Sequence, residues 1–108
     1  MKAMINSQFT VEQFNGNGSF TLWQRRVKDV LVQQGLYKAL KGKDGKPETM
    51  KADEWEELKL WCVSTIQLYI ANNIIIYVMD EDSAPGLWEK LEKLYMAKSL
   101  TNKLHLKW

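Results

Sequence analysis

The chain has 108 residues, of which 45% are hydrophobic, 26% are charged and 11% are aromatic. This balance indicates one soluble globular domain and excludes both a disordered chain and two independent cores. The formal net charge of +2 is too small to indicate a nucleic-acid partner by itself.

Few side chains in this composition can form a chemical site. The single cysteine, Cys62, and the single histidine, His105, exclude an internal disulfide and a cysteine-rich zinc site. The first residues lack the apolar run of a signal peptide, and the longest apolar stretch, residues 74–79, is too short to span a bilayer. We therefore expect a cytoplasmic protein with no metal, no cofactor, no small-molecule substrate and no membrane partner.

The first half of the chain predicts one long helix after a polar lead-in of residues 1–13. A glycine-rich turn ends at Ser19, and either Ser19 or Thr21 is suited to cap the helix that follows. We expect Gly35 to end that helix, residues 36–40 to add one or two helical turns, and residues 42–50 to form a loop. The apolar residues of the long helix have the i, i+3, i+4, i+7 spacing of one face: Phe20, Trp23, Val27, Val30 and Leu31.

The second half predicts two more amphipathic helices. The first begins near Asp53, and the second is capped by Ser83 and has Pro85 in its first turn. Between them, residues 74–79 are β-branched like a strand, but the sequence offers no partner strand, so we predict a buried helix. The apolar face of the first helix contains Trp55, Leu58, Cys62, Ile66, Tyr69 and Ile70, and that of the second contains Leu87, Trp88, Leu91, Leu94 and Tyr95.

A last helix is predicted from Ser99 or Thr101 onward. It has an apolar stripe of Leu100, Leu104 and Trp108, which we expect to pair weakly with a second copy of the chain.

Residues 14–108 therefore predict an all-α fold, a small orthogonal bundle of four to six helices. We expect Trp23, Trp55, Trp88 and Tyr95 to anchor its core, with the three tryptophans mostly buried. On this basis Trp88→Ala would cost about 3–5 kcal/mol of stability.

Basic residues gather in the first half of the chain. Arg25, Arg26 and Lys28 lie on the first helix, and the lysines that follow are Lys38, Lys41, Lys43 and Lys46. With Trp23 nearby they indicate a possible RNA contact, and a small nucleic-acid-binding helical module is the alternative function. The small net charge favours a solvated helix face, so we expect RNA binding to be weak and without sequence preference.

The sequence does not indicate an enzyme. The carboxylates near Glu54 and Asp80 are explained by the electrostatics of helix starts. Ser64 and Ser83 lack a histidine base, and Cys62 lies on a core stripe, which is typical of a buried small side chain.

Several motifs, in order, resemble the N-terminal part of Gag from copia-type long-terminal-repeat retrotransposons, especially those of plants. Each motif alone has little specificity, whereas the ordered set from Phe9 to Lys107 is specific. The motifs are FNGNGSFTLWQRR at 14–26, LVQQGL at 31–36, KPETM at 46–50, DEWEEL at 53–58, DEDS at 80–83, GLW at 86–88, LEKLYM at 91–96 and SLTNKL at 99–104.

This resemblance implies a structural, non-catalytic domain with a fold like the N-terminal domain of a capsid protein. It implies that the chain associates with copies of itself or with related Gag chains, toward a virus-like particle around the element's RNA. Family members continue the last helix and carry a Cys/His zinc knuckle further along, so the resemblance implies a domain truncated in its last helix. At Leu60, Trp61 and Cys62, and again at 74–77, this chain is more apolar than its relatives.

Overall fold

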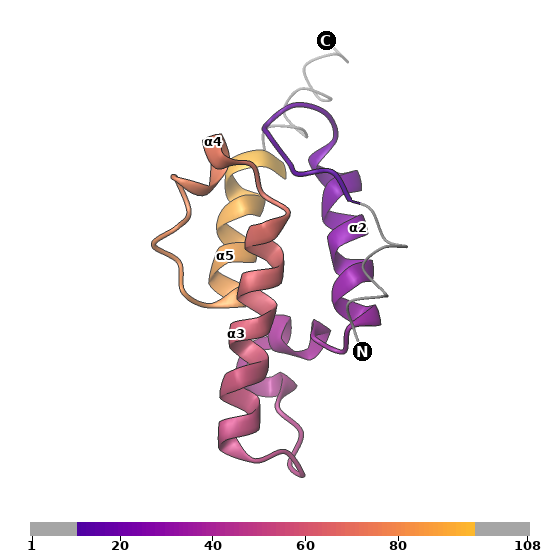
Figure 1. Cartoon of the computed structure of the whole chain (residues 1–108), viewed down its shortest axis with the longest axis vertical. Helices are drawn as coiled ribbons and strands as arrows, with labels where there is room; N and C mark the ends of the chain where they lie inside the picture. Colours follow the sequence, from indigo (N-terminus) through magenta and orange to yellow (C-terminus); the bar gives the residue numbers. More distant parts are fainter. Residues whose placement is uncertain (1–10, 97–108) are drawn as a thin grey trace.

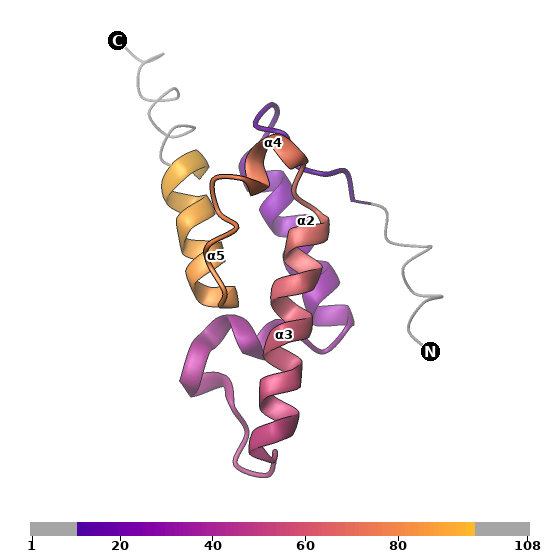
Figure 2. The ribbon, with the colours of Figure 1, turned by 60° about the vertical axis from the view of Figure 1, so that its left-hand side comes forward.

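The computed structural model describes residues 11–96 of the chain. Within that range the backbone is mostly helical, and the only pairing of extended backbone is an isolated parallel bridge between Phe14 and Ile70. The predicted all-α fold is therefore confirmed. The elements, shown in Figures 1 and 2, are α2 (Phe20–Gln33), the 3-10 helix η1 (Tyr37–Gly45), α3 (Ala52–Leu68), α4 (Asn72–Ile75), α5 (Ala84–Leu91) and the π-helical turn η2 (Glu92–Met96).

The long helix α3 lies at the centre of the bundle. In Figure 1, α2 and α5 flank it on opposite sides, and η1 runs across the lower end of the bundle. The short helix η1 contacts α2, α3 and α5, so it connects all three helices. At the other end, η2 contacts α2 and follows directly on α5.

Helix α2 has the boundaries that the sequence predicts. The Ser19 hydroxyl accepts a hydrogen bond from the Leu22 N–H at 3.1 Å, which satisfies one of the free donors of the first turn. At the other end Gly35 has a φ of 75°, a left-handed conformation that favours glycine. The predicted stripe faces inward, and all five of its apolar side chains are buried: Phe20, Trp23, Val27, Val30 and Leu31.

The region after Gly35 is more helical than predicted. The 3-10 helix η1 continues through a kink at Gly42, whose φ is 69°, and ends at Gly45, inside the segment that we expected to be a loop. Because each 3-10 turn needs only three residues, helical turns can form on both sides of a glycine kink.

Helix α3 begins with Asp53 and Glu54 in its first turn, where negative charge favours the helix dipole. Just after the end of α3, the parallel bridge pairs Ile70 with Phe14, which lies in the segment before α2. The Phe14 N–H donates to the Tyr69 carbonyl at 2.9 Å, and the Ala71 N–H donates to the Phe14 carbonyl at 2.9 Å.

The prediction of a buried helix over residues 74–79 is wrong. Helix α4 is a single turn that ends at Ile75, and tight turns follow it. Ile74 and Val78 are buried in the core, because two side chains four residues apart fall on one side of a helical turn. Ile75 is partly buried against the core, and the three remaining large side chains of the segment are exposed: Ile76, Tyr77 and Met79.

Helix α5 begins as predicted, because the Ser83 hydroxyl accepts a hydrogen bond from the Gly86 N–H at 3.1 Å and Pro85 lies in the first turn. Leu87 and Leu91 are fully buried against the core, whereas Leu94 is exposed.

Aromatic rings form the upper part of the core. Trp23 and Trp55 are each 6% exposed, while Trp88 and Tyr95 are only partly buried and pack against the core from its edge. The Trp23 indole N–H donates to the Tyr69 carbonyl at 2.9 Å, so its one polar group has a partner. The ring centroids of Trp23 and Trp88 lie 6.2 Å apart in a stacked arrangement, and Tyr95 meets the ring of Phe14 edge-on at 5.0 Å.

Candidate interaction surfaces

The solvent side of α3 has an unusual run of large apolar side chains. Leu60 is 68% exposed, Trp61 is 60% exposed and Leu68 is 69% exposed. At 3.6 residues per turn these three positions fall within an arc of about 100° around the helix axis. We call this set the α3 face. It lies away from the core stripe of the same helix, so the spacing of these three apolar residues in the sequence already indicates a second apolar side of this helix.

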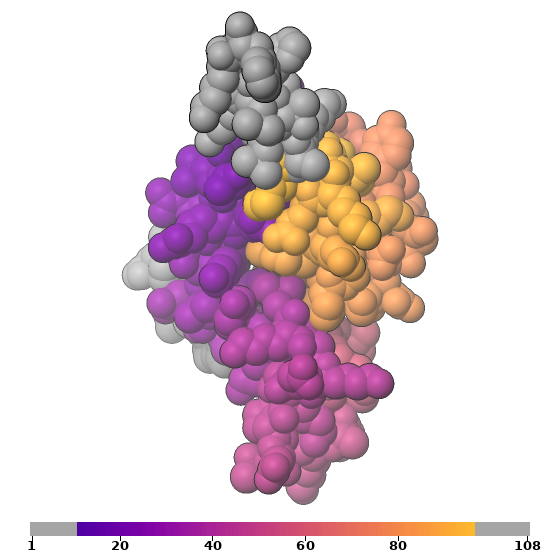
Figure 3. Space-filling model, turned by 180° about the vertical axis from the view of Figure 1, so that it is seen from behind, coloured from indigo at the N-terminus to yellow at the C-terminus, as the bar shows by residue number. Residues whose placement is uncertain are grey.

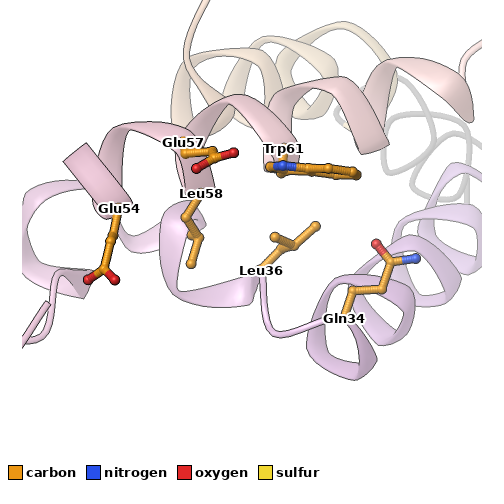
Figure 4. Close-up of a pocket in the computed structure, with 6 residues that line it drawn as sticks. All are labelled: Gln34, Leu36, Glu54, Glu57, Leu58 and Trp61. Atoms are coloured by element: carbon orange, nitrogen blue, oxygen red, sulfur yellow. The ribbon is translucent and has the colours of Figure 1, made fainter. Parts of the chain in front are cut away.

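A groove borders the α3 face. It has a volume of about 390 Å³ and lies between α3 and the segment that follows α2. In Figure 4 the Trp61 ring extends over the groove from α3, and Leu36 and Leu58 point into the same space. The other lining residues are Gln34, Glu54 and Glu57, so an apolar floor has two carboxylates beside it.

Basic and aromatic side chains line a second space at the junction of α2, η1 and α5. Figure 3 shows the face of the molecule on which these three elements lie side by side. The second space has a volume of about 390 Å³, and we call it the basic hollow. Its lining residues are Thr21, Gln24, Arg25, Lys28, Tyr37, Leu40, Lys41, Trp88 and Glu92.

The structure separates the three basic residues that the sequence grouped together. Arg25 and Lys28 line the basic hollow, whereas Arg26 lines a different space beside the turn before α2. Positions 26 and 28 are about 200° apart around a helix, so their side chains leave on opposite sides. Lys41 and the Tyr37 ring line the basic hollow with Arg25 and Lys28, whereas Arg26 does not. The spacing of residues along α2 cannot predict this, because Tyr37 and Lys41 come from η1.

The predicted self-association stripe of Leu100, Leu104 and Trp108 lies outside the described residues, so its place in the fold stays a prediction.

Little in the described part of the chain is arranged for catalysis. Cys62 is fully buried, and burial raises the pKa of its thiol from 9.0 to about 12, which suppresses the reactive thiolate. Residues 11–96 contain no group of three or more His, Cys, Asp or Glu side chains that could hold a metal ion. No helix in the same range is long and apolar enough to cross a membrane.

Comparison with known proteins identifies a family and a relative of this chain. The sequence matches the family described as the gag-polypeptide of LTR copia-type over residues 27–108. It is also 46% identical over 104 residues to the "Retrovirus-related Pol polyprotein from transposon TNT 1-94" of Nicotiana tabacum. That alignment covers 96% of this chain but 8% of the relative, so the chain spans a small part of that polyprotein. No solved structure matches the chain.

Together the family match and the tobacco relative confirm the resemblance that the motifs indicated. The structure adds a helical fold for residues 11–96. The chain therefore belongs to the family of Gag polypeptides from copia-type LTR retrotransposons, and it corresponds to a structural rather than a catalytic region of such a polyprotein.

Proposed function

We propose that this chain acts by associating with other copies of itself, as one building unit of a Gag particle. The α3 face is the observation that carries this proposal. Exposed apolar area costs about 25 cal/mol per Å², and several large apolar side chains on one surface are typical of a protein-protein contact. The position of Leu60, Trp61 and Leu68 on one long helix makes this surface rigid.

Two further features support the α3 face as the contact. Tryptophan is enriched among the residues that dominate interface energies, and Trp61 is a large ring held at the rim of a groove. The groove floor, Leu36 and Leu58, gives an apolar side chain from a second copy a place to enter. A contact of this size is small, so we expect a dissociation constant that is micromolar or weaker.

Sedimentation of the full chain over a range of concentrations tests the proposal. We expect the mean mass to rise with concentration. Replacing Leu60, Trp61 and Leu68 together by Gln should return the protein to a monomer, because Gln preserves helix propensity and removes the apolar contact. All three positions are exposed, so the variant should keep its helical circular dichroism and its melting temperature.

Leu22→Gln is the matched control, since Leu22 is also an exposed leucine within a helix but lies on α2. It should associate like the unchanged chain. The proposal fails if the unchanged chain stays monomeric at the highest soluble concentration. If the triple Gln variant associates as strongly as the unchanged chain, the contact does not involve the α3 face.

A further inference from the structure

We propose that the basic hollow binds single-stranded RNA, with backbone phosphates at Arg25, Lys28 and Lys41 and a base against the aromatic side chains. This goes beyond self-association and uses a separate surface, so either proposal can fail without the other.

The charges of the basic hollow are out of balance. Arg25, Lys28 and Lys41 are three cations around one space, and within residues 11–96 none of them forms an ion pair with a carboxylate. The one carboxylate that lines the hollow, Glu92, accepts a hydrogen bond from the Gln24 amide at 2.7 Å. Three cations against one carboxylate leave an excess of positive charge that a phosphate would neutralise.

Two of these cations lie at the same ring. The ammonium of Lys28 is 5.3 Å from the centroid of Tyr37, and the ammonium of Lys41 is 5.6 Å from it. Each contact with the ring is favourable and holds a cation beside an aromatic side chain. The Tyr37 ring also restricts both flexible side chains, so less of their conformational entropy is lost on binding.

Aromatic side chains supply the second half of a nucleotide site. Tyr37 and Trp88 both line the hollow, and both are only partly buried. Trp88 stacks on Trp23, which fixes the plane of its indole. Bases stack on such rings with little regard to sequence, and cations beside aromatic rings are the usual composition of single-strand binding surfaces. The volume of about 390 Å³ is within the range of small-ligand sites.

RNA and a free nucleotide share this chemistry, and they differ in how many phosphates they offer. We favour RNA because Arg25 and Lys28 lie on α2 and Lys41 lies on η1, so the three cations can meet successive phosphates of one strand. The expected affinity is low, with a dissociation constant of about 1–100 µM, since three phosphate contacts are few.

The test is fluorescence anisotropy of a labelled twelve-residue oligouridylate, titrated with the full chain at 50 and 200 mM KCl. Three cation contacts to a single strand give a slope of about −2 in log K against log salt, so affinity should fall about 20-fold between these two conditions. The combined change Arg25→Ala, Lys28→Ala and Lys41→Ala should lower the affinity at 50 mM at least about tenfold and remove most of the salt slope.

Arg26→Ala is the matched control, because it removes one positive charge from the same helix but from a different space. It should keep the slope and change the affinity less than about twofold. Lys41→Gln alone should make the slope of log K against log salt less steep by about 0.7, because one phosphate contact is lost. This single change tests the proposal if the triple variant does not fold. Unlabelled uridine triphosphate is the second arm. If uridine triphosphate displaces the labelled oligouridylate at the same concentration as unlabelled oligouridylate does, the ligand is a free nucleotide. If only the unlabelled oligouridylate displaces it, the ligand is a strand of RNA.

Three results would overturn the proposal: no binding at 50 mM KCl, binding that is unchanged in the triple variant, or an Arg26→Ala variant that loses as much affinity as the triple one. The last would mean that only the net charge of α2 matters.

Discussion

The indole rings of Trp23 and Trp88 stack on one another, yet the two residues have different surroundings. Trp23 is on the inward stripe of α2 and is 6% exposed, while Trp88 is at the edge of the core beside the basic hollow. Helical spacing predicts which positions face a core, but it cannot tell the centre of that face from its edge. The edge depends on where the neighbouring helices end, here η1 and η2, and that is set by tertiary packing.

At the residue scale, the two tryptophans should differ in their contribution to stability. Trp23→Ala should lower the free energy of unfolding by about 3–5 kcal/mol, because it empties a buried site and leaves the Tyr69 carbonyl without its indole donor. Trp88→Ala should cost about half as much, which is less than its sequence position suggested. Urea unfolding followed by circular dichroism measures both. Equal costs would show that Trp88 is as buried as Trp23.

A second residue-scale prediction concerns Cys62. Its thiol has a pKa of about 12 in the fold and an ordinary 9.0 when exposed, because burial disfavours the thiolate. The neutral thiol therefore stabilises the fold below pH 9, and this contribution is lost as the pH rises from 9 toward 12.

Alkylation by iodoacetamide at pH 9 reports on this directly. The folded chain should react at least about a hundredfold more slowly than the chain in urea, since only the thiolate attacks. Cys62→Ser gives the background rate. Comparable rates in the folded and unfolded states would contradict the burial of the thiol.

At the scale of elements, the helix starts were predictable and the irregular segments were not. Ser19 and Ser83 cap α2 and α5 through hydrogen bonds within four residues of sequence, so local chemistry determines both starts. The turns after α4 and the kink in η1 depend on contacts with distant parts of the chain. Their β-branched or glycine-containing sequences are compatible with more than one backbone path.

The cap of α5 gives a prediction at this scale. Ser83→Ala should lower stability by about 0.5–2 kcal/mol, because the Gly86 N–H loses its acceptor. Ser64→Ala is the control, since Ser64 is an exposed residue in the interior of α3, where Ala is the better helix former. In thermal unfolding, the melting temperature of Ser64→Ala should equal or slightly exceed that of the unchanged chain. A melting temperature for Ser83→Ala equal to that of the control would contradict the role of the cap.

At the scale of the whole molecule, α3 provides the candidate contact face on one side, and the basic hollow lies where α2, η1 and α5 meet. From the sequence we expected an apolar contact in the C-terminal stripe, and a basic contact on the first helix and the lysine-rich segment that follows it. The α3 face comes from one helix and its spacing is visible in the sequence. The basic hollow joins residues 25 and 41, and only the fold brings them together.

The C-terminal stripe and the α3 face make different predictions about association. If Leu100, Leu104 and Trp108 form the contact, a chain ending at Ser99 should sediment as a monomer where the intact chain associates. If the α3 face forms it, the shortened chain should associate as the intact one does. Sedimentation of both chains beside the triple Gln variant therefore decides between them, because each version removes only one of the two apolar surfaces.

The proposed contacts should also respond to salt in opposite ways. Apolar association through the α3 face does not depend on charge, so raising KCl from 50 to 200 mM should leave it unchanged or slightly stronger. RNA binding in the basic hollow should weaken about 20-fold over the same range. The triple Gln variant should therefore bind RNA with unchanged affinity, and the Arg25, Lys28 and Lys41 variant should still associate. Loss of both properties in either variant would mean that RNA binding requires assembled chains, so that the two surfaces act as one.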